Sequence, residues 1–289
     1  MFTIQNETIS VVIRPKGAEL DSIYHKAFQL EYLWSGDPAF WAKKSPVLFP
    51  IVGTLKNDRY DFEGKAYHMG RHGFARDAVF EVSEQSGDAI TLFMKSSDHT
   101  LGLFPFPFVF SIRYALEQHR LHVAYTVKNT GTGTMYFSVG GHPAFKVPLE
   151  ANAGYEDYHL EFGAMENAGR WPISGEGLIE DAPEPLLDNT NILPLTKELF
   201  SSDALVFKSL ASNTLRLKSS KAAHGLEMDF TGFPYLGIWA AKDADFVCIE
   251  PWCGIADGVN ASGQLTEKEG IHKLEEGMVF TRTYTLTFF

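Results

Sequence analysis

The stretch that decides the fold class is residues 108–127, FVFSIRYALEQHRLHVAYTV. Every second residue from Phe108 to Leu116 is large and apolar, and the same alternation returns from Leu121 to Val127, after Gln118-His119. A period of two places the apolar side chains on one face of a strand. Two such runs joined by a short polar turn predict a β-hairpin with one buried face.

Similar patterns lie on both sides of this hairpin. Residues 79–82 and 89–94 flank a turn over 85–88, and residues 9–13 predict a strand near the start. Residues 279–288 are rich in β-branched and aromatic side chains, which favours a final strand that pairs into a central sheet.

Helical spacing is rare in the chain. Asp37 followed by Pro38 predicts the start of a short helix of one or two turns over residues 37–42, with Asp37 as its cap. Residues 169–194 are rich in Pro, Gly and acidic residues and predict an irregular surface segment that forms a rim of the site. Without a linker or a repeat, residues 1–289 are expected to form a single large all-β domain.

Composition limits the class of ligand. Hydrophobic residues make up 45% of the chain, enough for a large core, and the formal charge of −11 opposes binding to nucleic acid and to anionic membranes. A neutral or locally neutralised small molecule is therefore the expected partner. The N-terminus has no signal-peptide pattern and no stretch approaches the ~20 apolar residues of a membrane span, so a cytoplasmic location is expected.

Common cofactor and nucleophile motifs are missing from the sequence. There is no Gly-x-Ser-x-Gly and no phosphate-binding loop, and Gly131-Thr132-Gly133 lacks a third glycine because Tyr136 occupies its place. Cys248 and Cys253 lack the spacing of a zinc site and are expected to be reduced and packed in the core. We therefore expect no cofactor and no metal.

Three residues stand out as candidates for acid–base chemistry. His72 lies in Arg71-His72-Gly73-Phe74, and His142 lies in Gly140-Gly141-His142-Pro143. Glu250 follows the apolar run 246–249, so its carboxylate is expected to be buried, with a raised pKa or with hydrogen-bond partners. Each residue alone also fits a purely structural role.

Several motifs together resemble the aldose 1-epimerase (galactose mutarotase-like) family. They are Lys56-Asn57-Asp58-Arg59-Tyr60, Arg71-His72-Gly73-Phe74, Gly141-His142-Pro143-Ala144-Phe145, residues 203–207, Glu250-Pro251-Trp252 and Asp257-Gly258-Val259-Asn260. The His-Gly-Phe, Gly-Gly-His-Pro and Glu-Pro-Trp variants resemble its LacX-like branch. The resemblance implies a β-supersandwich of two large twisted antiparallel sheets, whose concave face holds an aldohexose.

The resemblance also implies roles for individual residues. Glu250 is the expected base on the anomeric hydroxyl, and His142 is the acid that protonates the ring oxygen. His72 hydrogen-bonds the ring oxygen or the anomeric region. Arg59 and Asp203 hold sugar hydroxyls. The expected reaction is interconversion of α and β anomers by ring opening and reclosure.

Other residues and readings stay open at this point. Trp252 and Phe74 are either apolar platforms for the sugar or core residues. Arg71 and Arg76 either favour a hexose 6-phosphate or pair with neighbours such as Asp77. A non-catalytic carbohydrate-binding protein, and a metalloenzyme with His72, His142 and Glu250 as ligands, are the alternatives from other classes. The sequence leaves open whether the protein is a monomer or a homodimer.

Overall fold

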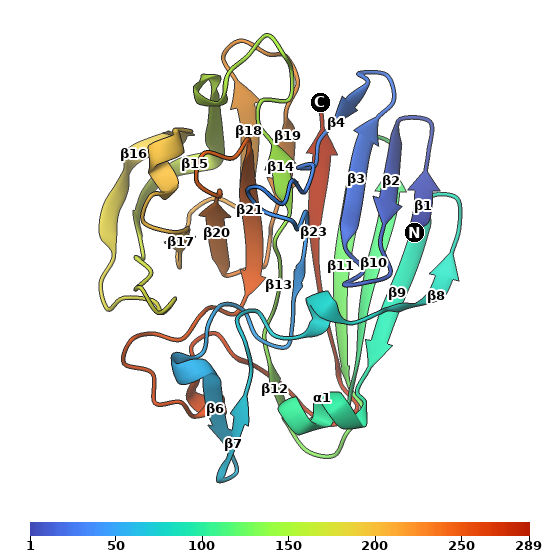
Figure 1. Cartoon of the computed structure of the whole chain (residues 1–289), viewed down its shortest axis with the longest axis vertical. Coiled ribbons are helices and arrows are strands. Elements are labelled where there is room, and N and C mark those ends of the chain that lie inside the picture. The colour runs from blue at the N-terminus through green and yellow to red at the C-terminus, as the bar shows by residue number, and fades with distance from the viewer.

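The computed structural model describes residues 1–289 and consists mainly of antiparallel strands (Figure 1). Its largest sheet has nine strands in the order β16-β15-β18-β19-β23-β11-β10-β9-β8. Their bounds are β8 (Glu81–Gln85), β9 (Ala89–Lys95), β10 (Phe108–Glu117), β11 (Arg120–Asn129), β15 (Tyr158–Arg170), β16 (Glu184–Pro194), β18 (Thr214–Ser219), β19 (Leu226–Asp229) and β23 (Val279–Phe288).

A second sheet of six strands has the order β17-β20-β21-β13-β5, and β14 also pairs with β21. Its strands are β5 (Val47–Leu48), β13 (Val139–Gly141), β14 (Ala144–Lys146), β17 (Leu205–Phe207), β20 (Tyr235–Trp239) and β21 (Phe246–Cys253). A four-stranded N-terminal sheet consists of β1 (Phe2–Gln5), β2 (Ile9–Ile13), β3 (Leu20–His25) and β4 (Leu30–Glu31).

The remaining elements are short. Two isolated strand pairs are β6 (Arg59–Phe62) with β7 (Lys65–His68), and β12 (Met135–Phe137) with β22 (His272–Leu274). The helices are α1 (Asp98–Leu103) and the 3-10 turns η1 (Lys56–Asp58), η2 (Ala75–Asp77), η3 (Tyr155–Asp157), η4 (Lys197–Phe200) and η5 (Leu265–Glu267). No helix in the chain is long and apolar enough to cross a membrane.

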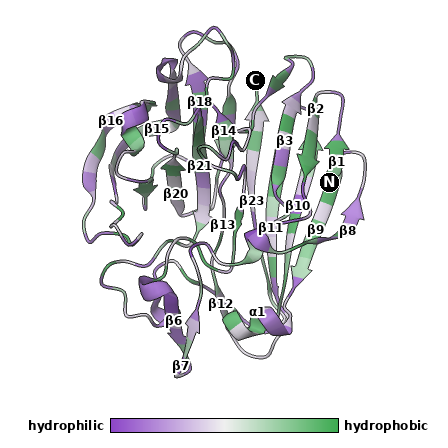
Figure 2. Ribbon diagram, in the orientation of Figure 1, coloured by the Kyte–Doolittle hydropathy of each residue, from purple (hydrophilic) through white to green (hydrophobic).

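The six-stranded and N-terminal sheets lie over one face of the nine-stranded sheet (Figure 1). The ring of Phe49, which follows β5, stacks on Phe110 of β10 with 4.4 Å between ring centroids. The hydroxyl of Tyr114 donates a 2.8 Å hydrogen bond to the carbonyl of Ala18 beside the N-terminal sheet. Buried and more exposed residues alternate along β10. Figure 2 shows hydrophobic and hydrophilic residues within the same strands. The predicted all-β architecture is confirmed.

The hairpin predicted from residues 108–127 is confirmed. β10 and β11 pair around Gln118-His119, with Glu117 opposite Arg120, and their large apolar side chains are buried. The predicted final strand is β23, which lies between β11 and β19 in the middle of the nine-stranded sheet. Both cysteines are free and buried, as expected.

Residues 37–42 form a single turn, closed by the Trp41 amide on the Asp37 carbonyl at 2.9 Å, and the Asp37 carboxylate accepts from the Ala39 amide at 2.9 Å. The structure thus has the shorter of the two predicted lengths, and no helix continues beyond the turn. One local prediction is wrong. Residues 184–194 are not irregular but form β16, an edge strand whose register against β15 is interrupted by bulges. Only the part between Arg170 and Glu184 connects the strands, and it includes the turn Ser174–Gly177.

Candidate active site

Strand β21 supplies the carboxylate of the site. All of its residues are buried, because it lies between β20 on one side and β13 and β14 on the other. Side chains alternate along a strand, so Cys248, Glu250 and Trp252 point to one face. The Glu250 side chain is only 2% exposed.

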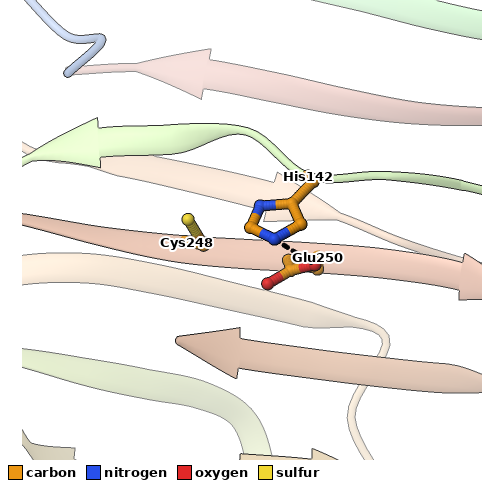
Figure 3. Close-up of side chains that lie close together, drawn as sticks. All are labelled: His142, Cys248 and Glu250. Atoms are coloured by element: carbon orange, nitrogen blue, oxygen red, sulfur yellow. Dashed lines mark ion pairs between the residues drawn. The ribbon is translucent and has the colours of Figure 1, made fainter. Parts of the chain in front are cut away.

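His142 faces Glu250 because of the strand register. β13 and β14 pair with the same strand β21, so that Gly140 lies opposite Trp252 and Ala144 lies opposite Cys248. The residue between these two pairs, His142, is therefore placed opposite Glu250. Its Nε2 lies 3.3 Å from Oε2 of Glu250 (Figure 3).

Two glycines beside β21 make room for the indole of Trp252. A Cβ added to Gly140 would lie 2.8 Å from Cδ1 of Trp252, and one added to Gly237 would lie 2.4 Å from its Cζ2. Gly237 is also the residue paired with Glu250 on β20. The lack of a side chain at both positions lets the indole extend across the sheet beside the carboxylate.

His72 is held by the backbone of Gly53. It has a left-handed φ of 69°, its amide donates to the Gly53 carbonyl at 2.8 Å, and its Nδ1 accepts from the Gly53 amide at 3.0 Å. Because Nδ1 is an acceptor, the neutral ring carries its proton on Nε2, which is then a fixed donor. The rings of His72 and His142 are nearly perpendicular, with centroids 5.8 Å apart.

These residues line one cavity of about 290 Å³. Its lining residues are Trp41, Arg71, His72, Arg76, His142, Asp203, Ala204, Trp239, Glu250 and Trp252. The His142 and Glu250 side chains are 11% and 2% exposed, whereas those of Arg71 and Asp203 are 46% and 35% exposed. The two proton-transfer candidates thus lie at the floor of the cavity, and a loose Arg71–Asp203 pair at 3.9 Å lies at its rim.

Burial favours the uncharged forms of Glu250, His142 and His72 at the floor of the cavity. It raises the pKa of Glu250 well above its usual range, and the positive charge of Arg71 partly opposes this rise. Burial lowers the pKa of His142 to about 3 and lowers that of His72 well below its usual value. Nδ1 of His142, Oε2 of Glu250 and Nε1 of Trp252 are buried without a hydrogen-bond partner in the protein. Unpaired buried polar atoms are costly, and a polar ligand would satisfy them.

Two of the predicted binding residues do not line this cavity. Arg59 is on β6 and forms an exposed ion pair with Asp61 at 2.8 Å. Phe74 packs against the core, with its ring 6.3 Å from that of Phe49. Arg71, Arg76, Asp203 and Trp252 do line it.

Two lining residues, Trp41 and Trp239, were not predicted as site residues from the sequence. Trp41 stacks on His142 with 5.0 Å between ring centroids, and Trp239 meets the same ring edge-on at 5.7 Å. Trp41 belongs to the segment that was predicted to be helical. Trp239 pairs with Cys248, a register that becomes visible only when β20 is aligned with β21.

The possible metal-donor atoms that lie closest together do not belong to the predicted set of His72, His142 and Glu250. His142, Cys248 and Glu250 each offer a buried donor atom within 4.8 Å of the others (Figure 3). Nδ1 of His72 is already occupied by the Gly53 amide. Burial also raises the pKa of the Cys248 thiol well above its usual value, which opposes the thiolate form that metals prefer.

The whole chain is similar to proteins of one family. Residues 1–281 match the family model described as Aldose 1-epimerase. Protein LacX of Lactococcus lactis subsp. lactis, in its chromosomal form, is 33% identical over 98% of both chains.

Solved structures agree over the same length. A galactose mutarotase related enzyme from Lactobacillus acidophilus is 35% identical, with a TM-score of 0.95 over 100% of this chain and 97% of that one. A galactose mutarotase-like protein from Lactobacillus casei is 33% identical, with a TM-score of 0.94 over 100% of both chains. The fold is therefore galactose mutarotase-like.

Proposed function

Because this chain belongs to the aldose 1-epimerase family, we propose that it interconverts the α and β anomers of an aldohexose. The observation that supports this most is the pairing of His142 with Glu250 at the floor of a cavity that opens to solvent past Arg71 and Asp203. Such a pair can remove one proton and deliver another within a few ångströms.

In the proposed reaction, one proton leaves the sugar and one proton is returned to it, and both transfers involve residues of the site. Glu250 takes the proton from the O1 hydroxyl as the bond between C1 and the ring oxygen breaks, and C1 becomes an aldehyde. His142 gives a proton to the ring oxygen, which becomes a hydroxyl. Rotation about the C1–C2 bond presents the other face of the aldehyde, and the reverse transfers close the ring. Nε2–H of His72 donates to the ring oxygen, while Arg71 and Asp203 hold hydroxyls.

Glu250 and His142 together carry one proton at every stage of the proposed reaction. Burial favours the uncharged pair, and the charged pair differs from it only in which of the two residues carries this proton. The two atoms that carry it lie 3.3 Å apart. The charge of Arg71 favours the carboxylate. The cycle therefore needs no net proton from solvent, and a pair of this kind has shared rather than individual pKa values.

Polarimetry tests the proposal. The protein is added to freshly dissolved α-D-glucose or α-D-galactose, and the approach to rotational equilibrium is followed. Acceleration that survives a chelator supports metal-independent acid–base catalysis. Acceleration lost on chelation and restored by zinc would support the metalloenzyme. Saturable binding of the sugar without acceleration would support the non-catalytic binder.

A hexose 6-phosphate is a second candidate substrate, favoured by the two arginines in the cavity. Arg76 donates to the Arg71 carbonyl at 3.0 Å, and its Nε makes no hydrogen bond but lies 3.9 Å from Oδ2 of Asp77. Arginine is suited to binding phosphate oxygens in pairs. Anomer exchange of glucose 6-phosphate, followed by NMR, compares this candidate with the free hexose.

A further inference from the structure

His142 lacks the hydrogen bond that commonly orients a catalytic histidine. In many acid–base sites, the ring nitrogen that faces away from the reaction is held by a carboxylate or a carbonyl. Nδ1 of His142 is buried without a hydrogen-bond partner in the protein, while its Nε2 lies 3.3 Å from Oε2 of Glu250. Another part of the molecule must therefore fix the plane of this imidazole.

The backbone around His142 is fixed, but the backbone alone does not set the plane of the ring. The His142 amide donates to the Pro46 carbonyl at 3.1 Å, and the Ala144 amide donates to the Lys44 carbonyl at 2.8 Å. Rotation of a histidine ring about its Cβ–Cγ bond has a broad, twofold profile. A half-turn would place Cε1 instead of Nε2 opposite Glu250, and a carbon atom there cannot exchange the proton.

Three aromatic rings pack around the imidazole. Trp41 is stacked on it, with 5.0 Å between centroids and 29° between planes. Trp239 and His72 are nearly perpendicular to it, with centroids at 5.7 and 5.8 Å. A half-turn of the imidazole passes through an orientation at right angles to its plane, which a stacked ring obstructs in a close-packed interior. Trp41 is the only stacked neighbour of the three.

Trp41 is itself held in place. Its carbonyl accepts a 2.8 Å hydrogen bond from Nε1 of Trp34. Trp34 is buried, and its own amide donates at 3.0 Å to the carbonyl of Ala144, two residues after His142. The Trp41 ring also stacks on Phe246 of β21, with centroids 5.6 Å apart. The indole is therefore tied to β14 and β21, two of the strands that position the imidazole.

The stack also suits the charge that the imidazole gains when it holds the shared proton. A cation within about 6 Å of a tryptophan ring centroid is attracted by the face of the ring. The centroids of Trp41 and His142 are 5.0 Å apart. Burial opposes the positive charge and lowers the pKa of His142 to about 3, so the indole favours the form that burial disfavours.

We propose that Trp41 is a positioning residue, which holds the imidazole of His142 by stacking where other sites use a hydrogen bond. This inference rests on the proposed function, because it gives Trp41 a part in the proton exchange between His142 and Glu250. Trp41 also lines the cavity, but it acts through His142. Its loss should therefore reduce turnover rather than the binding of the sugar.

Three substitutions and a matched control test the proposal. Trp41→Leu removes the stacked ring, and Trp41→Phe keeps an aromatic plane at this position. Trp34→Phe removes the N–H that holds the Trp41 carbonyl, and Trp34 does not line the cavity. Phe40→Leu is the control, because Phe40 lies in the same turn, is 45% exposed and does not line the cavity either. Thermal melting checks that each variant is folded.

Anomer exchange of glucose or galactose, measured by NMR over a range of concentrations, gives kcat and KM. We expect Trp41→Leu to lower kcat roughly 10–100-fold, the scale of a misplaced catalytic group, with KM nearly unchanged. Trp41→Phe should recover most of this loss, and Trp34→Phe should show a smaller loss. Phe40→Leu should change neither constant.

The mobility of the His142 ring gives a readout that does not depend on turnover. The NMR signal of its Cε1–H group is assigned by its absence in His142→Ala, and ¹³C relaxation of this group reports motion of the ring. We expect a rigid ring in wild-type protein. In Trp41→Leu and Trp34→Phe, we expect a second signal, exchange broadening or a lower order parameter.

The outcomes separate this inference from the proposed function. A raised KM with unchanged kcat in Trp41→Leu would make Trp41 a platform for the sugar and overturns the proposal, as does a rigid imidazole in both Trp41→Leu and Trp34→Phe. If Trp41→Leu does not fold, an unchanged kcat and a rigid imidazole in Trp34→Phe overturn it. If wild-type protein exchanges no sugar faster than buffer, the proposed function fails, and ring mobility still decides whether Trp41 positions His142.

Discussion

Glu250 and His142 acquire their chemistry from burial rather than from charged partners. Desolvation raises the pKa of the carboxyl and lowers the pKa of the imidazole, so the two groups compete for one proton across a short contact. His72 differs, because the Gly53 amide occupies its Nδ1 and leaves a single fixed donor. These differences are those expected if Glu250 and His142 exchange the proton in the proposed reaction and His72 positions the sugar.

The pH dependence of kcat/KM follows from these directions. Since the pKa of His142 is lowered to about 3, acidification through the ordinary histidine value near 6.5 should not protonate the pair. The raised pKa of Glu250 keeps the shared proton in place above the usual pH range of a glutamate. We expect kcat/KM to stay constant on acidification through about pH 6.5, and to fall on the high-pH side where the shared proton is lost. An acid limb centred near 6.5 would contradict this.

Removing either member of the pair should reduce turnover without unfolding the protein. Glu250→Gln cannot accept a proton and His142→Ala cannot donate one, so each should lower kcat by roughly 10²–10⁴-fold. Initial polarimetric rates give kcat, and thermal melting checks the fold. Cys248→Ala, on the same face of β21, is the matched control and should keep its rate. A near-normal rate in Glu250→Gln or His142→Ala would remove that residue from the mechanism.

At the scale of elements, a buried ion pair connects the segment that follows η5 with the segment that follows β21. Nζ of Lys268, after η5, lies 2.6 Å from Oδ1 of Asp257, and both side chains are at most 5% exposed. The other oxygen of Asp257 accepts from the Lys56 amide at 3.0 Å, and the Asp257 amide donates to the Thr54 carbonyl at 2.9 Å. The segment that contains Gly53, the partner of His72, is thus tied to the segment after β21.

Breaking this pair should destabilise the protein strongly. Lys268→Met leaves the Asp257 carboxylate buried and unpaired, which typically costs about 3–5 kcal/mol of unfolding free energy. Urea denaturation measures the loss. Lys16→Met is the control, because Lys16 pairs with Asp77 in an exposed contact that is worth at most about 1 kcal/mol. Equal and small losses in both variants would show that the buried pair has no such role.

The elements best predicted from sequence are those with strict alternation. Residues 108–127 predicted β10 and β11 because the apolar spacing leaves one choice of buried face. The short helix α1 was missed although Ser97 and Thr100 form a capping box there. The register that places His142 opposite Glu250 joins segments about a hundred residues apart, and no local pattern records such a pairing.

At the scale of the whole molecule, the last strand, β23, is the central strand of the largest sheet. β23 pairs with β11 along its length and with β19 on its other side, so it joins the two halves of the nine-stranded sheet. The sequence predicted this central position from composition and place in the chain. In the second sheet, the apolar run 246–249 predicted the buried strand β21, which shows no alternation because all of its residues are buried. The other strands of this sheet are short, and the cavity was expected only through the family resemblance.

Truncation before β23 should therefore prevent native folding. A chain that ends at residue 277 leaves one edge of β11 and one edge of β19 without a partner, because each then pairs only with β10 or β18. Near-UV circular dichroism should show the loss of fixed aromatic packing. A chain lacking residues 1–5 is the control, since β1 is an edge strand paired only with β2. A native spectrum from the C-terminal truncation would contradict the assigned role of β23.

The central claim is that a buried carboxyl and imidazole, held opposite each other by strand register, interconvert the anomers of a sugar. NMR exchange between the α and β anomeric protons of an equilibrated aldohexose measures this directly, with no change in composition. We predict faster exchange with wild-type protein and exchange at the rate in buffer with Glu250→Gln. Equal exchange rates for the wild-type protein, Glu250→Gln and buffer would contradict the account.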